Sequence, residues 1–268
     1  PSLITIKAMR KANPDIPMVA VFDTAFHRSL PERAWRYAIP QELADKHGIR
    51  RYGFHGLAHR YMSERYAAIA KKPEESLKLI TLQLGNGCSA AAIDGGHPID
   101  TSMGFTPLEG LVMGTRSGDI DPSLVNYIAR CEKISTQEVE DLLNKKSGLL
   151  GLSGKWRDMR ELLRDEEKGV AAAALAIDIF CYRVRKYVGA YLAALGGADA
   201  IILGGGIGEN AALVRARILS GMEWCGLKLD EKCNEAAIRV ESCISAADSD
   251  IKAYVIPVDE ASIIARET

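Results

Sequence analysis

A glycine-rich stretch at residues 100–122 carries side chains suited to anion chemistry. It holds four glycines, two prolines, one arginine and three aspartates, and its apolar residues follow neither a helical nor a strand period. Arg116 lies between Gly114 and Gly118, so its planar guanidinium has room to approach a carboxylate or a phosphate. Long irregular loops in compact chains are usually functional. Chemistry alone leaves two interpretations open: an anion-binding loop, or a surface loop with one structural salt bridge.

A second glycine-rich segment, residues 204–210, follows the apolar run 200–203. It lacks the last glycine of the dinucleotide-binding fingerprint, where Glu209 stands, and it lacks the Gly-Lys-Ser/Thr ending of a Walker A loop. A strand, a glycine run and a helix start can nevertheless place backbone N–H groups against phosphate. We favour this interpretation over a tight turn, because four of the five positions 204–208 are glycine.

Asp23, His55 and His59 are further polar candidates. Asp23 ends the apolar run 17–23, which we expect to be a buried strand, and open α/β sheets place ligand-contacting groups at such ends. Capping of the next turn is the commoner role for such an aspartate. His55 and His59 would share one face of a helix, but a metalloprotease motif requires Glu after the first histidine, where this chain has Gly56. A metal-binding histidine pair is therefore not expected.

Five motifs in order resemble those of the acetate and propionate kinase family. Besides the loop around Arg116 they are Phe-Asp-Thr-Ala-Phe-His at 22–27, Arg-Tyr-Gly-Phe-His-Gly at 51–56, Leu-Gly-Asn-Gly at 84–87 and Gly-Gly-Ile-Gly-Glu-Asn at 205–210. The resemblance runs along the whole chain, and five ordered motifs are far more specific than any one of them. It implies phosphoryl transfer between ATP and a short carboxylate, giving an acyl phosphate, with Mg²⁺ as cofactor.

The resemblance also implies a role for particular residues. The implied catalytic residues are Asp23, His55 and Arg116, and the implied Mg²⁺ ligands are Asp23 and Glu260. The residues implied to bind the nucleotide are Asn86, Gly87, Arg157, Gly206, Ile207 and Asn210. Phe54 and Pro107 would line a small apolar pocket for the methyl group of the carboxylate. Such a transfer depends on alignment and on charge compensation at the phosphoryl oxygens more than on covalent chemistry by the protein.

Two sites depart from the family pattern. Lys155 and Trp156 stand where an acidic and an apolar residue are usual, directly before Arg157, the residue implied to flank the base. Val258 and Ala261 stand where the family usually has Thr and a second Glu, on either side of Glu260.

A larger departure concerns the organisation into domains. The family's first actin-like domain, with its serine- and lysine-bearing stretch, has no counterpart in this sequence. We therefore expect 1–27 to be the end of that domain, 28–259 to be the second, nucleotide-binding domain, and 260–268 to begin a helix that packs toward the first. A missing N-terminal segment would then be required in cis or in trans.

The hydrophobic pattern predicts the elements that must position these residues. Three strand-like runs at 78–84, 89–93 and 97–101 are separated by Asn-Gly and Asp-Gly turns, the strongest short hairpin signals. Runs at 200–203 and 251–256 complete a mixed five-stranded sheet with helices on both faces. A capping box opens one helix at Ser135, and an Ala-rich helix is expected from about 166 to 195. This order is that of an α/β, actin-like ATPase (ribonuclease-H-like) domain.

Composition excludes several classes of function. A net charge of −1 gives no electrostatic case for nucleic acid or a membrane surface, and no apolar run approaches the length of a membrane span. Six scattered cysteines form no Cys-x-x-Cys pair, so we expect reduced thiols, a cytoplasmic protein and no zinc site. The resemblance adds a homodimer formed through the second domain.

Three functions stay open at this point. The resemblance favours acetate as the phosphoryl acceptor. The alternatives are a propionate or butyrate kinase, and a truncated, non-catalytic module that binds nucleotide and dimerises. One methylene in an apolar pocket changes the binding free energy by only about 1–3 kcal/mol, so the sequence does not separate acetate from propionate.

Overall fold

The computed structural model describes residues 2–268, so the first residue of the predicted segment 1–27 lies outside the described residues. The α-helices are α1 (Ser2–Ala12), α2 (Glu32–Trp35), α3 (Gln41–His47), α4 (Gly56–Ala70), α5 (Ser123–Glu132), α6 (Thr136–Lys145), α7 (Gly148–Ser153), α8 (Met159–Glu167), α9 (Ala171–Leu195), α10 (Gly205–Asn210), α11 (Ala212–Leu219), α12 (Glu231–Ala236) and α13 (Glu260–Glu267). Short 3-10 helices are η1 (Asp23–Ser29), η2 (Glu74–Ser76) and η3 (Glu223–Cys225). The strands are β1 (Lys78–Leu84), β2 (Cys88–Asp94), β3 (His97–Thr101), β4 (Ala200–Gly204), β5 (Ser242–Cys243) and β6 (Lys252–Val255).

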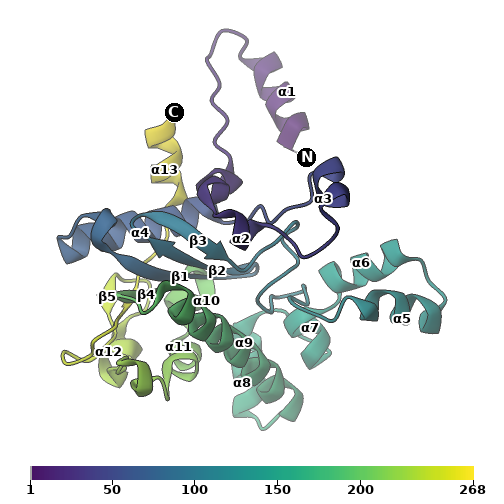
Figure 1. Ribbon diagram of the computed structural model, residues 1–268. Coiled ribbons are helices and arrows are strands. Elements are labelled where there is room, and N and C mark those ends of the chain that lie inside the picture. Colours follow the sequence, from purple (N-terminus) through teal and green to yellow (C-terminus); the bar gives the residue numbers. More distant parts are fainter. Residues whose placement is uncertain (1) are drawn as a thin grey trace.

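A mixed six-stranded sheet lies at the centre of the chain, in the order β3-β2-β1-β4-β6-β5 (Figure 1). Strands β1, β2 and β3 form the predicted antiparallel meander, and β4 and β6 extend it in parallel from β1. The prediction of a mixed α/β sheet is confirmed, but its strand number was wrong. Strand β5 has only two residues, too few to show the alternation by which a strand is recognised.

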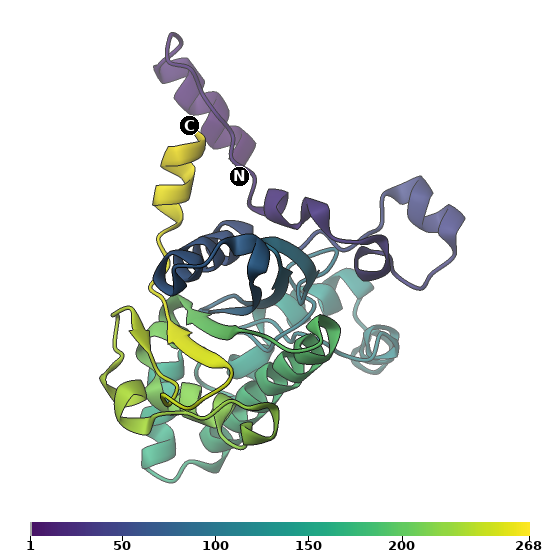
Figure 2. The same ribbon diagram turned by 60° about the vertical axis from the view of Figure 1, so that its left-hand side comes forward.

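Helices cover both faces of this sheet, as predicted. Helix α4 lies on one face and the long helix α9 on the other (Figures 1 and 2). Strand β1 is buried on both sides: Leu79 packs with Met62 of α4, whereas Ile80 belongs to the larger cluster around Phe180 of α9. Because successive side chains of a strand point to opposite faces, both faces of β1 must be apolar, which explains its nearly continuous hydrophobic run.

The helical predictions hold with one correction. The capping box is present, with Ser135 and Glu138 bonding reciprocally at the start of α6. The expected helix 166–195 is instead the end of α8 followed by α9, which begins at Ala171. Gly169 between them has a φ of +80°, a left-handed conformation that ends a helix. No helix in residues 2–268 is long and apolar enough to cross a membrane.

The segment before η1 projects away from the sheet (Figures 1 and 2). The prediction of a buried strand at 17–23 was wrong: Val19 and Phe22 are 53% and 69% exposed, and residues 17–22 form no strand. An extended run becomes a strand only where a neighbour can pair with its backbone, and the described chain offers none there. From Asp23 onward the chain packs against α4 and β3, and His27 is fully buried. The predicted domain boundaries remain a prediction.

Candidate active site

A tight turn before α4 brings Asp23 and His55 together. His55 has a left-handed backbone with a φ of 56°, an uncommon conformation for a residue with a side chain. The Asp23 carboxylate accepts the backbone N–H of His55 at 2.6 Å and that of Leu57 at 3.3 Å. Asp23 therefore satisfies free N–H groups at the start of α4, far along the chain, and not those of the turn that follows it in sequence. The same bonds fix the carboxylate next to His55.

The His55 imidazole lies between a buried hydroxyl and a glycine. Its Nδ1 is 2.9 Å from the Ser89 hydroxyl oxygen. A Cβ added to Gly87 would lie 3.3 Å from His55 Nε2 and 3.5 Å from Arg116 Nη1, so both side chains face the same point. Burial lowers the pKa of His55, against the opposing charge of Asp23, and the Arg116 charge lowers it further. The imidazole is thereby favoured in its neutral form.

Arg116 is held by its own loop. Its Nη1 donates to the Pro107 carbonyl at 3.0 Å, and no carboxylate within residues 2–268 pairs with it. The salt bridges of this loop are instead those of Glu109 with Arg51 and of Asp119 with Arg183, so the guanidinium of Arg116 has no carboxylate partner in the described residues. An arginine in that state is available to an anionic ligand.

The loop 102–122 is pinned to the domain at Asp119. This carboxylate accepts the Gly110 N–H at 2.8 Å and the Tyr187 hydroxyl at 2.8 Å, and Arg183 lies 3.5 Å from it. Gly118 has a φ of +66°, and a Cβ there would come within 2.5 Å of two backbone carbonyls. The irregular loop is thus a defined structure, anchored to helix α9 through two side chains.

The two residues expected to line an acetyl pocket, Phe54 and Pro107, each neighbour one of the catalytic candidates. Phe54 precedes His55, is half-buried, and packs against the main core. Its carbonyl accepts a hydrogen bond from Nε2 of the buried His27 at 3.1 Å. Pro107 is half-buried and offers its carbonyl to Arg116. Pro107 is therefore bonded to Arg116 through its carbonyl, whereas Phe54 adjoins His55 in sequence and bonds through its carbonyl to His27.

A pocket of about 510 Å³ gathers most of the residues expected to bind nucleotide. Its lining comprises Gly85, Asn86, Arg157, Asp158, Met159, Arg160, Leu163, Gly206, Ile207, Asn210, Ala211 and Arg239. Five of the predicted residues are among them, and Gly87 follows next in the chain after Asn86. Sequence reasoning missed Arg160 and Arg239. Arg160 is the second residue of α8 and Arg239 lies on an irregular segment, and neither belongs to a motif. Arg239 donates to the Asn210 amide oxygen at 3.0 Å.

The glycine run at the end of β4 shapes one wall of this pocket. Gly205 has a φ of +76°, and a Cβ there would lie 2.7 Å from the Leu84 carbonyl oxygen. Gly206 has an ordinary φ, and a Cβ there would meet nothing within 4 Å. The Glu209 carboxylate accepts the N–H of Gly205 at 2.9 Å and that of Val258 at 3.2 Å. Glu209 thus stabilises the glycine turn. This role explains why the chain has Glu209 at the position where the dinucleotide-binding fingerprint has its last glycine.

Glu260 opens helix α13 near Asp23. Burial raises the pKa of Glu260, and the negative charge of Asp23 raises it further. Two carboxylates that repel each other in this way suit a cation between or beside them. Residues 2–268 hold no group of three or more carboxylate, imidazole or thiolate side chains able to enclose a metal ion. This donor set fits an ion that takes its remaining ligands from water or substrate.

The positions that depart from the family pattern have structural partners. The Trp156 indole N–H donates to Asp165 of α8 at 2.7 Å, and Lys155 lies over the Trp156 ring, 4.5 Å from its centroid. Both side chains are therefore engaged with α8 while Arg157 lines the pocket. Val258 packs behind the glycine turn, 2.7 Å from where a Cβ on Gly204 would be.

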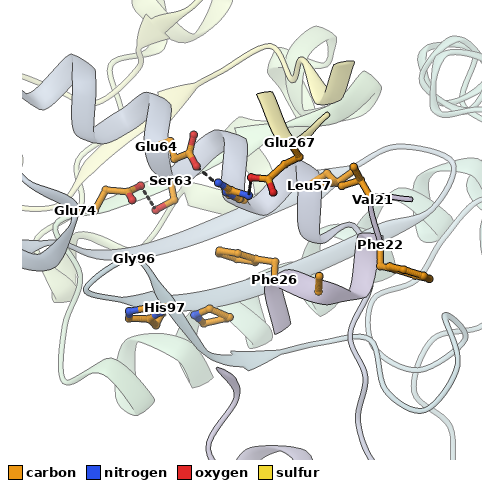
Figure 3. A pocket seen from close by; sticks show the side chains of 13 residues that line it. Val21, Phe22, Phe26, Leu57, Ser63, Glu64, Glu74, Gly96, His97 and Glu267 are labelled. Carbon is orange, nitrogen blue, oxygen red and sulfur yellow. Dashed lines mark hydrogen bonds and ion pairs between the residues drawn. The ribbon is translucent and has the colours of Figure 1, made fainter. Parts of the chain in front are cut away.

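A second pocket, of about 350 Å³, lies between α4, η1 and α13 (Figure 3). Ser63 of α4 points toward Glu74 (Figure 3). Arg60 lies 2.7 Å from the carboxylate of Glu64 and 2.7 Å from that of Glu267. None of the predicted site residues lines it. Arg60, Glu64 and Glu267 in it are paired with one another, and Glu74 accepts a hydrogen bond from Ser63, so it adds nothing to the site described above.

Comparison with known proteins places this geometry in a family. A sequence model described as the Acetokinase family matches residues 1–266. The chain is 53% identical over 263 residues to an acetate kinase of Chloroherpeton thalassium, a match that covers 97% of this chain. A crystal structure of Porphyromonas gingivalis acetate kinase superposes with a TM-score of 0.96 at 44% identity, and one of a Francisella tularensis propionate kinase with 0.94 at 45%. Each structural match covers 99% of this chain.

The chain is shorter than these relatives. It spans 63% of the length of the Chloroherpeton protein and 67% of each of the two solved chains. The match to the actin-like fold expected from the sequence is confirmed by the TM-scores. The requirement for a further N-terminal segment remains a prediction.

Proposed function

Because the chain belongs to the Acetokinase family, we propose that it carries out, or forms most of a protein that carries out, reversible phosphoryl transfer between ATP and acetate. The products are acetyl phosphate and ADP. The observation that best supports this reaction is that Arg116 and His55 both face Gly87. Gly87 follows Asn86, which lines the 510 Å³ pocket, called the nucleotide-side pocket. An unpaired guanidinium and an imidazole facing one point suit an oxyanion that gains charge during the transfer.

Arg116 and His55 supply fixed donors to the phosphoryl group in this proposal. The transferred group spreads its charge over three equatorial oxygens, and catalysis comes from alignment and electrostatic compensation. Arg116 contributes a full positive charge that no carboxylate of the described chain neutralises. His55 contributes a hydrogen bond from a neutral ring, favoured by burial and by the nearby arginine.

The nucleotide occupies the 510 Å³ pocket. Asn86 and Gly87 approach the phosphates from the β1–β2 turn, while Gly206, Ile207 and Asn210 hold the adenosine from the opposite wall. Arg157 flanks the base, with Arg239 behind Asn210.

Mg²⁺ is the cofactor in this proposal, held by Asp23 and Glu260 either directly or through water. When bound, the ion neutralises the charge of the nucleotide phosphates. Asp23 retains its two hydrogen bonds to the backbone of α4 while it faces the ion, so the start of α4 and the metal site are fixed together.

Acetate enters with its methyl group toward Phe54 and Pro107. Propionate is a second candidate acceptor, because one of the matching structures is of a propionate kinase and shares 45% identity with this chain. We propose a cytoplasmic homodimer for the active protein, which completes its cleft with an additional N-terminal segment.

Trapping of the acyl phosphate as a hydroxamate tests the reaction. ATP, Mg²⁺ and either acetate, propionate or butyrate are supplied to this chain alone, and to this chain with the N-terminal segment of an acetate kinase added separately. We expect hydroxamate from acetate foremost, and chiefly in the supplemented reaction. Folded protein that yields none in either preparation contradicts the proposed function. Equal yields in both contradict only the need for the segment.

A further inference from the structure

A buried row of hydrogen bonds runs inward from His55. Its Nδ1 is 2.9 Å from the Ser89 hydroxyl oxygen, which is also 2.7 Å from Nε2 of His59. The Nδ1 of His59 is in turn 2.7 Å from the Thr81 hydroxyl oxygen. Thr81, His59 and Ser89 are each 0% exposed. The row therefore has no access to water and ends at His55, the residue that faces Arg116.

The elements place these four residues by their ordinary periodicities. His55 and His59 are one helical turn apart at the start of α4, so both reach the same hydroxyl. Thr81 and Ser89 lie on the face of β1 and β2 that α4 covers, along with Leu79 and others of that cluster.

The protons in this row can be arranged in two directions. Burial holds the pKa of His59 well below its usual value, so this ring is neutral and carries one N–H. In the first direction Thr81 donates to His59, His59 to Ser89, and Ser89 to Nδ1 of His55. In the second direction each of these bonds is reversed, and Nδ1 of His55 is the first donor.

The two directions differ at the Thr81 end. In the second, the Thr81 hydroxyl accepts from His59 and its own proton has no acceptor, because the described chain gives this hydroxyl no other hydrogen-bond partner. A buried donor left without a partner costs about 1–3 kcal/mol. In the first direction every proton in the row is used. Only in this direction does Nδ1 of His55 accept a hydrogen bond, so that the proton of this ring lies on Nε2, which faces Gly87 and Arg116.

We propose that Thr81, His59 and Ser89 are positioning residues that hold His55 in the tautomer with its proton on Nε2. His55 then presents an N–H, and not a lone pair, to the point it shares with Arg116. A lone pair there would repel a phosphoryl oxygen, whereas an N–H donates to it. The tautomer follows from the buried row alone; its consequence for catalysis rests on the function proposed above.

Nitrogen NMR of the protein labelled with ¹⁵N-histidine reads the tautomer directly. His55 signals are assigned by their loss in His55→Gln. We expect a pyrrole-like Nε2 and a pyridine-like Nδ1 in the unaltered protein. In Ser89→Ala the two shifts should move toward each other, because nothing then fixes the proton. The matched control is Ser63→Ala, a buried serine of α4 that bonds to Glu74 at 3.2 Å and not to a histidine; it should leave both shifts in place.

Kinetics separate this role from simple packing. Ser89→Ala should lower kcat by about 10-fold, as loss of a group that orients an active-site ligand commonly does, with an unchanged KM for ATP. Ser89→Thr, which restores a hydroxyl, should recover most of the rate and the original shifts. If Ser89→Ala does not fold, Thr81→Val serves instead, since removing the terminal donor should also release the tautomer.

The outcomes are distinct. A pyridine-like Nε2 in the unaltered protein, or unchanged shifts in folded Ser89→Ala and Thr81→Val, overturns the proposal. The expected shifts in a protein that makes no acyl phosphate would support the buried row and contradict the proposed function.

Discussion

At the scale of the residue, Arg116 offers the sharpest test of the chemistry. Arg116→Ala in the catalytically complete protein should lower kcat by roughly 10²-fold or more, because the charge it places beside His55 is not replaced. Affinity for ATP should change little, since Arg116 does not line the nucleotide-side pocket. Steady-state kinetics of acyl phosphate formation, with calorimetry of ATP binding, measure the two effects separately.

The matched control is Arg130→Ala. Arg130 is exposed on α5 and has no place in the site, so its removal should leave kcat and ATP affinity unchanged. Near-normal kcat in Arg116→Ala would remove this arginine from the mechanism.

Because His27 is buried, we expect the stability of the fold to decrease in acid. Burial lowers the pKa of His27 from 6.5 to about 4. Between these values the unfolded chain binds the proton and the folded chain does not. Neutral His27 therefore makes its full contribution to the free energy of unfolding above pH 6.5. As the pH falls from 6.5 toward 4, the free energy of unfolding decreases by about 3 kcal/mol because of this residue.

Urea unfolding across this pH range measures the effect. His27→Gln keeps an N–H for the Phe54 carbonyl but cannot titrate, so its stability should fall less steeply with acid than that of the unaltered chain. Parallel pH profiles for the two proteins would show that His27 is not responsible.

Residues in sequence motifs could be placed from the sequence, and isolated ones could not. Asn86, Arg157 and Gly206 lie in or beside recognisable motifs and meet in one pocket. Ser89 lies in an apolar strand with no motif around it. Only the register of β1 with β2, and the way α4 crosses them, puts its hydroxyl between two histidines.

At the scale of the element, two neighbouring glycines in the turn after β4 have different roles: Gly205 allows the backbone conformation, and Gly206 is proposed to leave room for the nucleotide. Gly206→Val should weaken ATP binding while leaving the fold intact, because its side chain would project into open pocket space. A positive φ at Gly206 would have given a second reason, but the left-handed residue of this turn is its neighbour Gly205. Calorimetry and thermal unfolding, run on the same sample, report binding and stability.

Gly205→Val is the comparison variant. It should destabilise the fold by about 1–3 kcal/mol or more, because a left-handed backbone and a close carbonyl both oppose a side chain there. If folded Gly206→Val binds ATP with unchanged affinity, the glycine run serves only as a tight turn and does not contact the nucleotide.

Elements whose turn or cap residues lie within their own sequence were predictable. Elements that form only by pairing with another strand were not. The meander and the capping box carry their own turn and cap residues. The run 17–23 has the composition of a strand, but strands are made by neighbours, and no sequence pattern within the run reports whether a neighbour exists.

At the scale of the whole molecule, the N-terminal region has two parts that meet at Asp23: an exposed part before it and a packed part after it. Residues 13–20 are exposed throughout, whereas His27 is buried against α4 and β3. Limited proteolysis should therefore cut within 13–22 and leave a resistant product beginning near Asp23, since exposed unpaired backbone is readily cleaved. Mass spectrometry of the product locates the cut. Resistance of 13–22 would mean that this segment is covered in solution, and cleavage within 24–30 would contradict the boundary.

The pairing of β1 with β4 has a consequence for how the chain is made. Leu79 and Ala200 are partners in the sheet, yet the loop around Arg116 and all of α5 to α9 are synthesised between them. During translation this edge of β1 stays unpaired until β4 has left the ribosome, and pairing between strands so distant in sequence is slow. Newly made chains are thus exposed to edge-to-edge aggregation in this interval, and their yield should depend on chaperones more than the stability of the finished fold would suggest.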